Sequence, residues 1–269
     1  MVLVKVQTFK YPQKYQKRVM NEDGTFLLVD YLVKVKDTGE TVYTTSEEEA
    51  KKAGIFNERE IYKPELIIIG SNEVTKGFEK ALRENEVGQE KEVEIPPEEG
   101  YGQRDLTKVK VFSIKRLAEK NVNVEEIKIG SSVEVDGKIG IVRAITSGRV
   151  TIDFNPPLAG KTLVYKFKIL KKIEDDKEKI VSLLGRWFPR IDESKFEVNL
   201  SDSEVTIKIP PEIFYVEGLQ LIKRTLFSSV VKYVPKVERV VFIEAYEKEK
   251  PKEEKKEEKS EETKQAEPQ

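Results

Sequence analysis

The sequence predicts an α+β protein in which an antiparallel sheet is packed with a helix, a small β-rich domain is inserted, and a further α+β domain follows. Apolar and polar residues alternate in "TFLLVDYLVKVKDTGETVYTT" and again in "LAGKTLVYKFKIL", which is the period of half-buried strands. Between these runs, short strand patterns meet at the turn signals "DGK" and "TSGR". Helical and alternating patterns then follow one another through residues 174–246. Together these observations predict three folded units.

The first unit begins with a β-hairpin, because "KDTGE" is a turn signal between the two alternating stretches that follow Thr25. "SEEEAKKAGIFN" has a serine cap, acidic residues in its first turn and a late glycine, which predict a short helix. "ELIIIG" is typical of a buried strand, and "VGQEKEVEIP" of a strand that follows a glycine turn. One face of the helix predicted in "EVTKGFEKAL" carries Val74, Phe78, Ala81 and Leu82.

The inserted unit is predicted to have a helix at "SIKRLAEKN" and three short strands in "SVEVDGKIGIVRAITSGRVTIDF". The last unit is predicted to have a helix at "DDKEKIVSLLGRWF", a hairpin at "KFEVNLSDSEVTIKIP", a long helix at "EGLQLIKRTLFSSVVKYV" and a strand at "VERVVFIEAY". The final segment, "EKEKPKEEKKEEKSEETKQAEPQ", is charged and almost free of apolar residues, so we expect disorder there.

Composition excludes several kinds of chemistry. The chain has no histidine and no cysteine, so it cannot build a serine–histidine triad, a cysteine nucleophile or a structural zinc site of the usual kind. We expect no cofactor and no metal, because no paired carboxylates or ligand spacings stand out. With 48 basic and 49 acidic residues, no overall field favours nucleic acid or an anionic membrane. The apolar runs are far shorter than the ~20 residues that span a bilayer, so we expect a cytoplasmic protein without a membrane segment.

Three stretches, "EVTKGFEKAL", "VGQEKEVEIPPEEGYG" and "NPPLAGKTLVYKFKIL", occur in the order typical of one family. With them the chain resembles the FKBP-type peptidyl-prolyl cis-trans isomerases over about residues 22–172. Within that family it resembles the insert-carrying branch that includes SlyD and the long archaeal proteins. The resemblance implies a sheet wrapped on a helix, with an insert-in-flap domain in the loop after the Tyr-Gly pair.

The resemblance and the composition together divide the chain into five parts. They are an N-terminal extension at 1–20, an isomerase domain at 21–103 and 158–173, an insert-in-flap chaperone domain at 104–157, a C-terminal α+β domain at 174–246 and a disordered charged tail at 247–269. Within the extension, residues 2–9 are a candidate strand. The tail has no histidine or cysteine, so nickel handling, as in SlyD, is not expected.

The resemblance implies a peptidyl-prolyl cis-trans isomerase with chaperone activity and a water-excluding aromatic cleft. Rotation about an X-Pro bond has a barrier near ~20 kcal/mol because amide resonance is lost, yet it needs no nucleophile. In this family such a cleft has an aromatic floor, here Phe78, and donors at its rim, here the Thr75 N–H and the Tyr101 hydroxyl. The implied catalytic residues are Tyr101, Tyr31, Phe78 and Tyr165, and the implied substrate-binding residues are Val42, Tyr43, Val74 and Thr75.

The stretch "VYTT" departs from the family pattern. Tyr43 stands where most relatives have an aspartate that points into the cleft, and Val42 stands where phenylalanine is common. We therefore predict isomerase activity that is present but low. The alternative is a holdase or assembly module on an isomerase fold with little or no turnover. At the level of single residues, the alternative for Phe78 is core packing, and Tyr31 and Tyr165 could be ordinary sheet residues.

The insert supplies apolar residues that could hold unfolded chains near the cleft. The candidates are Val111, Phe112, Ile114 and Leu117. The alternative is that they close the small core of this domain. A third hypothesis is that Lys108, Lys110, Lys115 and Arg116 contact ribosomal RNA.

The partners that follow from these readings are unfolded or nascent polypeptides with X-Pro bonds, in proximity to the ribosome. For residues 174–246 we predict a role in homodimer formation, because Trp187 and the strand core "VVFI" are typical interface material. Core packing is the alternative for most of these side chains.

Overall fold

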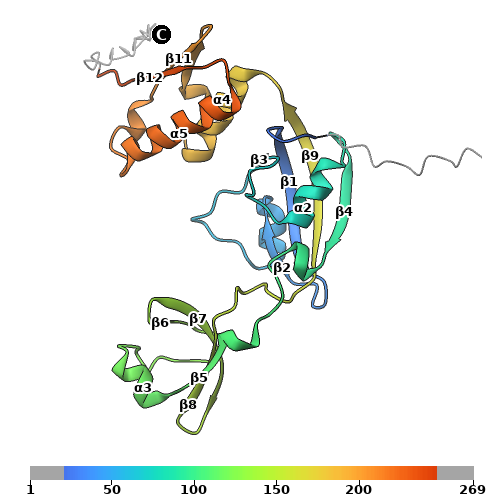
Figure 1. Ribbon diagram of the computed structural model, residues 1–269, viewed down its shortest axis with the longest axis vertical. Helices are drawn as coiled ribbons and strands as arrows, with labels where there is room; N and C mark the ends of the chain where they lie inside the picture. The colour runs from blue at the N-terminus through green and yellow to red at the C-terminus, as the bar shows by residue number, and fades with distance from the viewer. Residues whose placement is uncertain (1–20, 247–269) are drawn as a thin grey trace, which may run out of the picture.

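The computed structural model describes residues 21–246, so the predicted N-terminal extension and charged tail lie outside the described residues. Figure 1 shows three units in a row, with the inserted unit and the C-terminal unit on opposite sides of the first. The strands are β1 (Phe26–Val35), β2 (Thr41–Thr44), β3 (Glu65–Ile68), β4 (Glu90–Ile95), β5 (Val109–Ser113), β6 (Ser132–Val135), β7 (Lys138–Thr146), β8 (Arg149–Asp153), β9 (Leu163–Ile173), β10 (Glu197–Leu200), β11 (Glu204–Lys208) and β12 (Arg239–Ile243). The helices are α1 (Glu47–Lys52), α2 (Lys76–Arg83), α3 (Ile114–Glu119), α4 (Asp176–Trp187) and α5 (Leu219–Tyr233).

The first unit is an antiparallel five-stranded sheet in the order β2-β1-β9-β4, with β3 also paired to β1. β1 is long enough to pair with two short strands in turn, because its first half lies against β3 and its second half against β2. On its other side β1 pairs with β9 from Phe26 opposite Ile173 to Val35 opposite Leu163. Helix α2 packs on this sheet and buries Phe78 and Leu82. The fold is the α+β arrangement that the sequence predicts.

The inserted unit is an antiparallel sheet in the order β5-β8-β7-β6 with α3 beside it. The three strands predicted from the sequence are β6, β7 and β8, whereas β5 was not predicted. β5 ends directly at Ser113, whose side chain accepts a hydrogen bond from the N–H of Arg116 and so caps α3. No glycine or proline separates β5 from α3, so the sequence has no turn signal between the strand and the helix, and β5 was not predicted.

Two segments connect the first unit to the insert, one at residues 104–105 and one at residues 153–155, and polar contacts join them. Asn155 accepts a hydrogen bond from the N–H of Asp105 and donates one to the carbonyl of Asp105. The Arg104 guanidinium lies 2.8 Å from the Asp153 carboxylate, which is buried. Burial disfavours the charged form of Asp153, but hydrogen bonds from Asn155 and the Arg104 guanidinium outweigh it and hold the pKa below its usual value. These contacts therefore fix where the insert leaves and re-enters the sheet.

The C-terminal unit is a three-stranded sheet in the order β10-β11-β12 covered by α4 and α5. β11 pairs antiparallel with β10 and parallel with β12. The core of this unit includes Phe26, Ile68 and Ile173 from the first unit, so strands β1, β3 and β9 contribute to it. Among residues 21–246, no helix is long and apolar enough to cross a membrane.

Candidate functional site

Helix α2 positions the floor of a cleft in the first unit. Phe78 is fully buried, and its ring lies 4.5 Å from the ring of Tyr165 and 5.1 Å from that of Tyr31, centroid to centroid. Gly77 allows α2 to lie close to the end of β4, because a Cβ at Gly77 would be only 2.7 Å from Cγ2 of Ile95. The close approach of α2 brings Phe78 under the side chains of the sheet.

The walls of the cleft come from β1, β2 and β9. Tyr31 on β1 and Tyr165 on β9 stack with their ring centroids 6.4 Å apart. Their neighbours on either side of the cleft are Val42 and Val74, which pack on the same core while remaining partly exposed. Val74 precedes α2 rather than lying on it, because the helix begins at Lys76 with Thr75 as its N-cap.

Tyr101 lines the cleft from the loop between β4 and the insert. The residue is 46% exposed. Gly102 adopts a φ of 80°, which favours glycine. The Gly102 N–H donates to the Pro97 carbonyl at 2.7 Å, and its carbonyl accepts from the Gly160 N–H at 2.8 Å. This loop is therefore tied both to the end of β4 and to the returning chain, and Tyr101 is held at the entrance of the insert.

The cleft wall also contains a carboxylate, Glu65, that was not predicted from the sequence. Glu65 at the start of β3 accepts a hydrogen bond from the Tyr31 hydroxyl at 2.7 Å and another from the Tyr43 hydroxyl. The rings of Tyr31 and Tyr43 lie 5.2 Å apart. A carboxylate from β3 therefore reaches the wall that Tyr43 forms, where the resemblance led us to expect none. The only signal in the sequence is the charged residue that opens the apolar run "ELIIIG".

The cleft tyrosines remain neutral hydrogen-bond donors. Burial raises the pKa of Tyr165 to about 12, and the neighbouring Tyr101 hydroxyl acts in the same direction. Burial, followed by the charge of Glu65, raises the pKa of Tyr31 far above its usual value. Burial and the hydrogen bond to Glu65 raise the pKa of Tyr43 as well. Within the described residues, the N–H of Thr75 donates to no other group, so it is available to a ligand.

All eight residues predicted for the catalytic and substrate-binding site line one cleft of about 590 Å³. They are Tyr31, Val42, Tyr43, Val74, Thr75, Phe78, Tyr101 and Tyr165. The structure adds Val33, Glu65, Glu73, Gly100 and Leu158 to the lining. A cleft of this size, with aromatic walls, tyrosine hydroxyls and two carboxylates, can enclose one apolar side chain and the amide beside it. Across residues 21–246, no group of three acidic side chains is placed to hold a metal ion.

The candidate surface of the insert divides into two parts. Val111 is 60% exposed and Ile114 is exposed too, whereas Phe112 is only 8% exposed and Leu117 is fully buried. Phe112 and Leu117 belong to the core of the insert, which corrects the expectation that they face solvent. Neighbouring side chains in a strand point to opposite faces, so Val111 and Phe112 cannot share one environment. Further exposed apolar residues, which the sequence analysis did not select, are Leu106, Ile129, Ile139 and Ile145.

Comparison with known sequence families identifies each of the three units. The family described as FKBP-type peptidyl-prolyl cis-trans isomerase matches residues 18–119. A family described as the FKBP26 IF domain matches residues 114–158, and one described as FKBP26 C-terminal matches residues 176–247.

Among curated proteins, the chain is 36% identical over 146 residues to a short-type peptidyl-prolyl cis-trans isomerase of Methanocaldococcus jannaschii, covering 54% of this chain and 90% of that protein. It is 32% identical over 127 residues to the FKBP-type peptidyl-prolyl cis-trans isomerase SlyD of Helicobacter pylori, covering 44% and 64%. It is 33% identical over 107 residues to a probable FKBP-type 16 kDa peptidyl-prolyl cis-trans isomerase of Pseudomonas fluorescens, covering 40% and 71%.

Proposed function

Because the chain belongs to the FKBP-type peptidyl-prolyl cis-trans isomerases, we propose that it isomerises X-Pro bonds of unfolded chains in the cleft above Phe78 and holds those chains on its insert. The observation that carries this proposal is the convergence of an apolar floor, stacked aromatic walls and neutral hydroxyl groups in one cleft. The substrate class is an extended polypeptide with an exposed proline.

The barrier to rotation about an X-Pro bond comes from amide resonance, and this determines how a cleft can lower it. A planar amide is more dipolar than a twisted one, so removal of water from the prolyl bond favours the twisted state relative to the planar state. The ring of Phe78 receives the proline, and Tyr31 and Tyr165 exclude water from both sides of it. The Thr75 N–H and the Tyr101 hydroxyl hold the carbonyl groups on either side of the bond. These interactions accelerate rotation only as far as they are stronger in the twisted state.

Glu65 positions the tyrosines of the wall. Its carboxylate accepts both hydroxyl hydrogens, from Tyr31 and from Tyr43, and thereby fixes where the two rings lie. This arrangement changes the expectation drawn from Tyr43 alone. With a carboxylate already present, Tyr43→Asp would place a second negative charge beside Glu65, and like charges in a half-buried site disfavour each other. We therefore expect no large rise in turnover from Tyr43→Asp.

A proline-limited refolding assay, run beside isomerisation of a short proline peptide, tests the proposal. We expect wild-type protein to accelerate both and Glu65→Gln to lower kcat/KM about three-fold to ten-fold, the size of one or two hydrogen bonds. The control is Glu58→Gln, an exposed carboxylate of the same unit that lies outside the cleft lining. A ten-fold rise with Tyr43→Asp and no effect of Glu65→Gln would contradict the role of Glu65.

The second candidate function is a holdase with little or no turnover, favoured by the exposed apolar side chains of the insert. Wild-type protein that suppresses aggregation of a proline-free client but fails to accelerate either proline-limited reaction would favour it.

Self-association and ribosome proximity remain predictions about partners. Trp187 and Ile243 are exposed on the C-terminal unit, and sedimentation at increasing protein concentration tests whether residues 174–246 join two copies. Lys108 and Lys110 are exposed on the insert, and salt-sensitive pelleting with ribosomes tests contact with RNA.

A further inference from the structure

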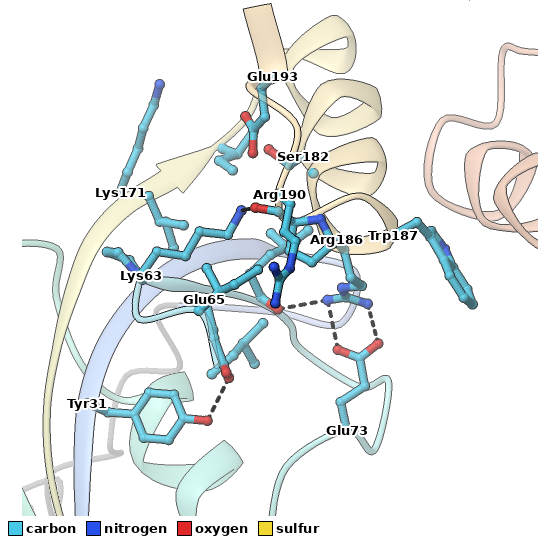
Figure 2. Close-up of a pocket in the computed structure, with 18 of the residues that line it drawn as sticks. Tyr31, Lys63, Glu65, Glu73, Lys171, Ser182, Arg186, Trp187, Arg190 and Glu193 are labelled. Atoms are coloured by element: carbon cyan, nitrogen blue, oxygen red, sulfur yellow. Dashed lines mark hydrogen bonds and ion pairs between the residues drawn. The ribbon is translucent and has the colours of Figure 1, made fainter. Parts of the chain in front are cut away.

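A second groove, with a volume of about 930 Å³, lies between the first unit and the C-terminal unit (Figure 2) and shares part of its lining with the cleft. Five residues line both spaces, so the two form one continuous surface: Tyr31, Tyr43, Glu65, Glu73 and Val74. Neither the residues predicted from the sequence nor the proposed cleft chemistry uses the far part of this groove. Because the two spaces share these residues, a chain whose proline occupies the cleft can reach the groove.

The walls of the groove are fixed relative to one another. Arg186 on α4 makes a bidentate ion pair with Glu73, with N···O distances of 2.6 and 2.9 Å, and also donates to the Leu66 carbonyl at 2.7 Å (Figure 2). Lys63 of the first unit donates to the Pro189 carbonyl at 3.3 Å, and Arg190 of the C-terminal unit donates to the Arg59 carbonyl at 2.8 Å. These contacts, and the packing of Phe26, Ile68 and Ile173 into the core of the C-terminal unit, form the groove before any ligand binds.

The lining beyond the cleft combines apolar side chains with charges of both signs. Ile61 of the first unit and Trp187 of the C-terminal unit are exposed large apolar side chains in the lining, and Pro64 and Pro189 also line the groove. Cations and carboxylates occur together along the groove, so no single charge is selected. The cations are Arg59, Lys63, Lys171, Arg186 and Arg190, and the carboxylates are Glu60, Glu65, Glu73, Glu178 and Glu193. A groove of this kind fits an extended backbone that carries an apolar side chain.

We propose that this groove is a second binding subsite, which takes an apolar residue of the polypeptide substrate several positions from the proline, on one side of it only. The proposal rests on the proposed function, because it assigns the groove to the same substrate as the cleft. The groove adjoins the cleft on one side only. Residues that follow the proline and residues that precede it leave the cleft in opposite directions, so only one of these two segments can contact the groove.

The only tryptophan of the chain, Trp187, gives a direct measurement. The probes are a short proline peptide and two longer ones, extended by about six residues with a central leucine on the amino or the carboxyl side, roughly 20 Å when extended. We expect one extended peptide to bind about ten-fold more tightly than the short one and to shift the emission of Trp187, because burial of one leucine is worth that much. The other extended peptide is expected to match the short one.

Ile61→Glu and Ile55→Glu are a matched pair of variants. The two isoleucines are 38% and 36% exposed and lie in the same loop, but only Ile61 lines the groove. We expect the affinity ratio of the extended over the short peptide to fall to about one in Ile61→Glu and to stay near ten in Ile55→Glu.

The outcomes separate the two proposals. Isomerisation of the short peptide without any gain from either extension, or with equal gain from both, overturns the subsite and leaves the proposed function intact. No isomerisation of the short peptide overturns the proposed function itself.

Discussion

The cleft unit and the insert use apolar residues in opposite ways. The cluster under the cleft contains fourteen buried apolar residues, and the aromatic side chains at its edge enclose a defined space. The cluster of the insert contains only seven buried residues, and much of its remaining apolar surface faces solvent, with Leu106 76% exposed. Both units are small sheets, yet one encloses a cavity and the other presents an open surface.

This difference explains how one chain can combine selectivity with tolerance. An enclosed cleft with fixed donors recognises one shape, which under the proposed function is a proline and its amide, because every contact depends on geometry. An open apolar surface gains free energy in proportion to the area it covers and has no preferred direction. We therefore expect sequence-dependent turnover from the cleft and sequence-independent holding from the insert.

Removal of the insert is expected to have the largest effect. Replacement of residues 105–157 by a short turn leaves the Gly102–Gly160 hydrogen bond to join the ends of the gap. We expect affinity for an unfolded, proline-free client to fall about ten-fold or more, because the exposed apolar side chains of the insert, such as Leu106, Val111 and Ile139, are lost. Aggregation suppression and titration with a labelled unfolded client measure this loss.

Turnover of a short proline peptide by the trimmed protein is the control for an intact cleft. If the trimmed protein suppresses aggregation as well as the full chain does, the assignment of client holding to the insert is wrong.

Tyr101→Phe is expected to affect only the cleft. The change keeps the ring and removes one hydroxyl donor at the rim, so we expect kcat/KM for a proline peptide to fall by a few-fold to ~30-fold. Holding of a proline-free client should not change, since Tyr101 lies outside the insert surface. Unchanged turnover in a well-folded variant would remove Tyr101 from the site.

Replacement of two exposed apolar residues is expected to affect only the insert. Leu106→Ser combined with Ile139→Ser removes side chains that face solvent, so the fold should be retained while client affinity falls about three-fold to ten-fold. The matched control is Leu170→Ser with Ile55→Ser, two exposed apolar positions of the first unit that line no part of the cleft. Equal losses in both double variants would show that general hydrophobicity, rather than the insert surface, governs holding.

The last prediction is that alkaline pH lowers the stability of the cleft unit but not that of the insert. Tyr165 has a pKa of about 12 against about 10 in an unfolded chain, so the folded cleft disfavours the ionised form. The neutral Tyr165 hydroxyl therefore contributes to the free energy of unfolding in full below about pH 10, and this contribution is lost as the pH rises toward about 12. The insert contains no tyrosine, so denaturant unfolding followed in the insert alone should show no such loss. Parallel alkaline weakening of both units would contradict this prediction.

The sequence predicts the cleft better than it predicts the surfaces around it. Its predicted residues converge because the family motifs preserve the pairing of β1 with β9 and the position of α2. Glu65 was missed because β3 and β2 lie on the same side of β1 at different heights, and only the folded sheet brings Glu65 beside Tyr43.

In the insert, strand alternation decides that Val111 is exposed and Phe112 is buried, but β5 was not recognised as a strand. The groove between the units could not be predicted either. It depends on the contact of Arg186 with Glu73, which lie 113 positions apart in the chain.

The pairing of β1 with β9 has a consequence for how each copy of the protein is made. β1 is synthesised early, but its central partner β9 follows only after α2, β4 and the whole insert. The strands of the insert pair with one another over much shorter separations. Local contacts form faster than distant ones, and domains fold as units while the chain emerges from the ribosome. We therefore expect the insert to be complete while Leu27 and Val29 on β1 still lack their cover, so that each new molecule acquires its client-holding surface before its isomerase cleft.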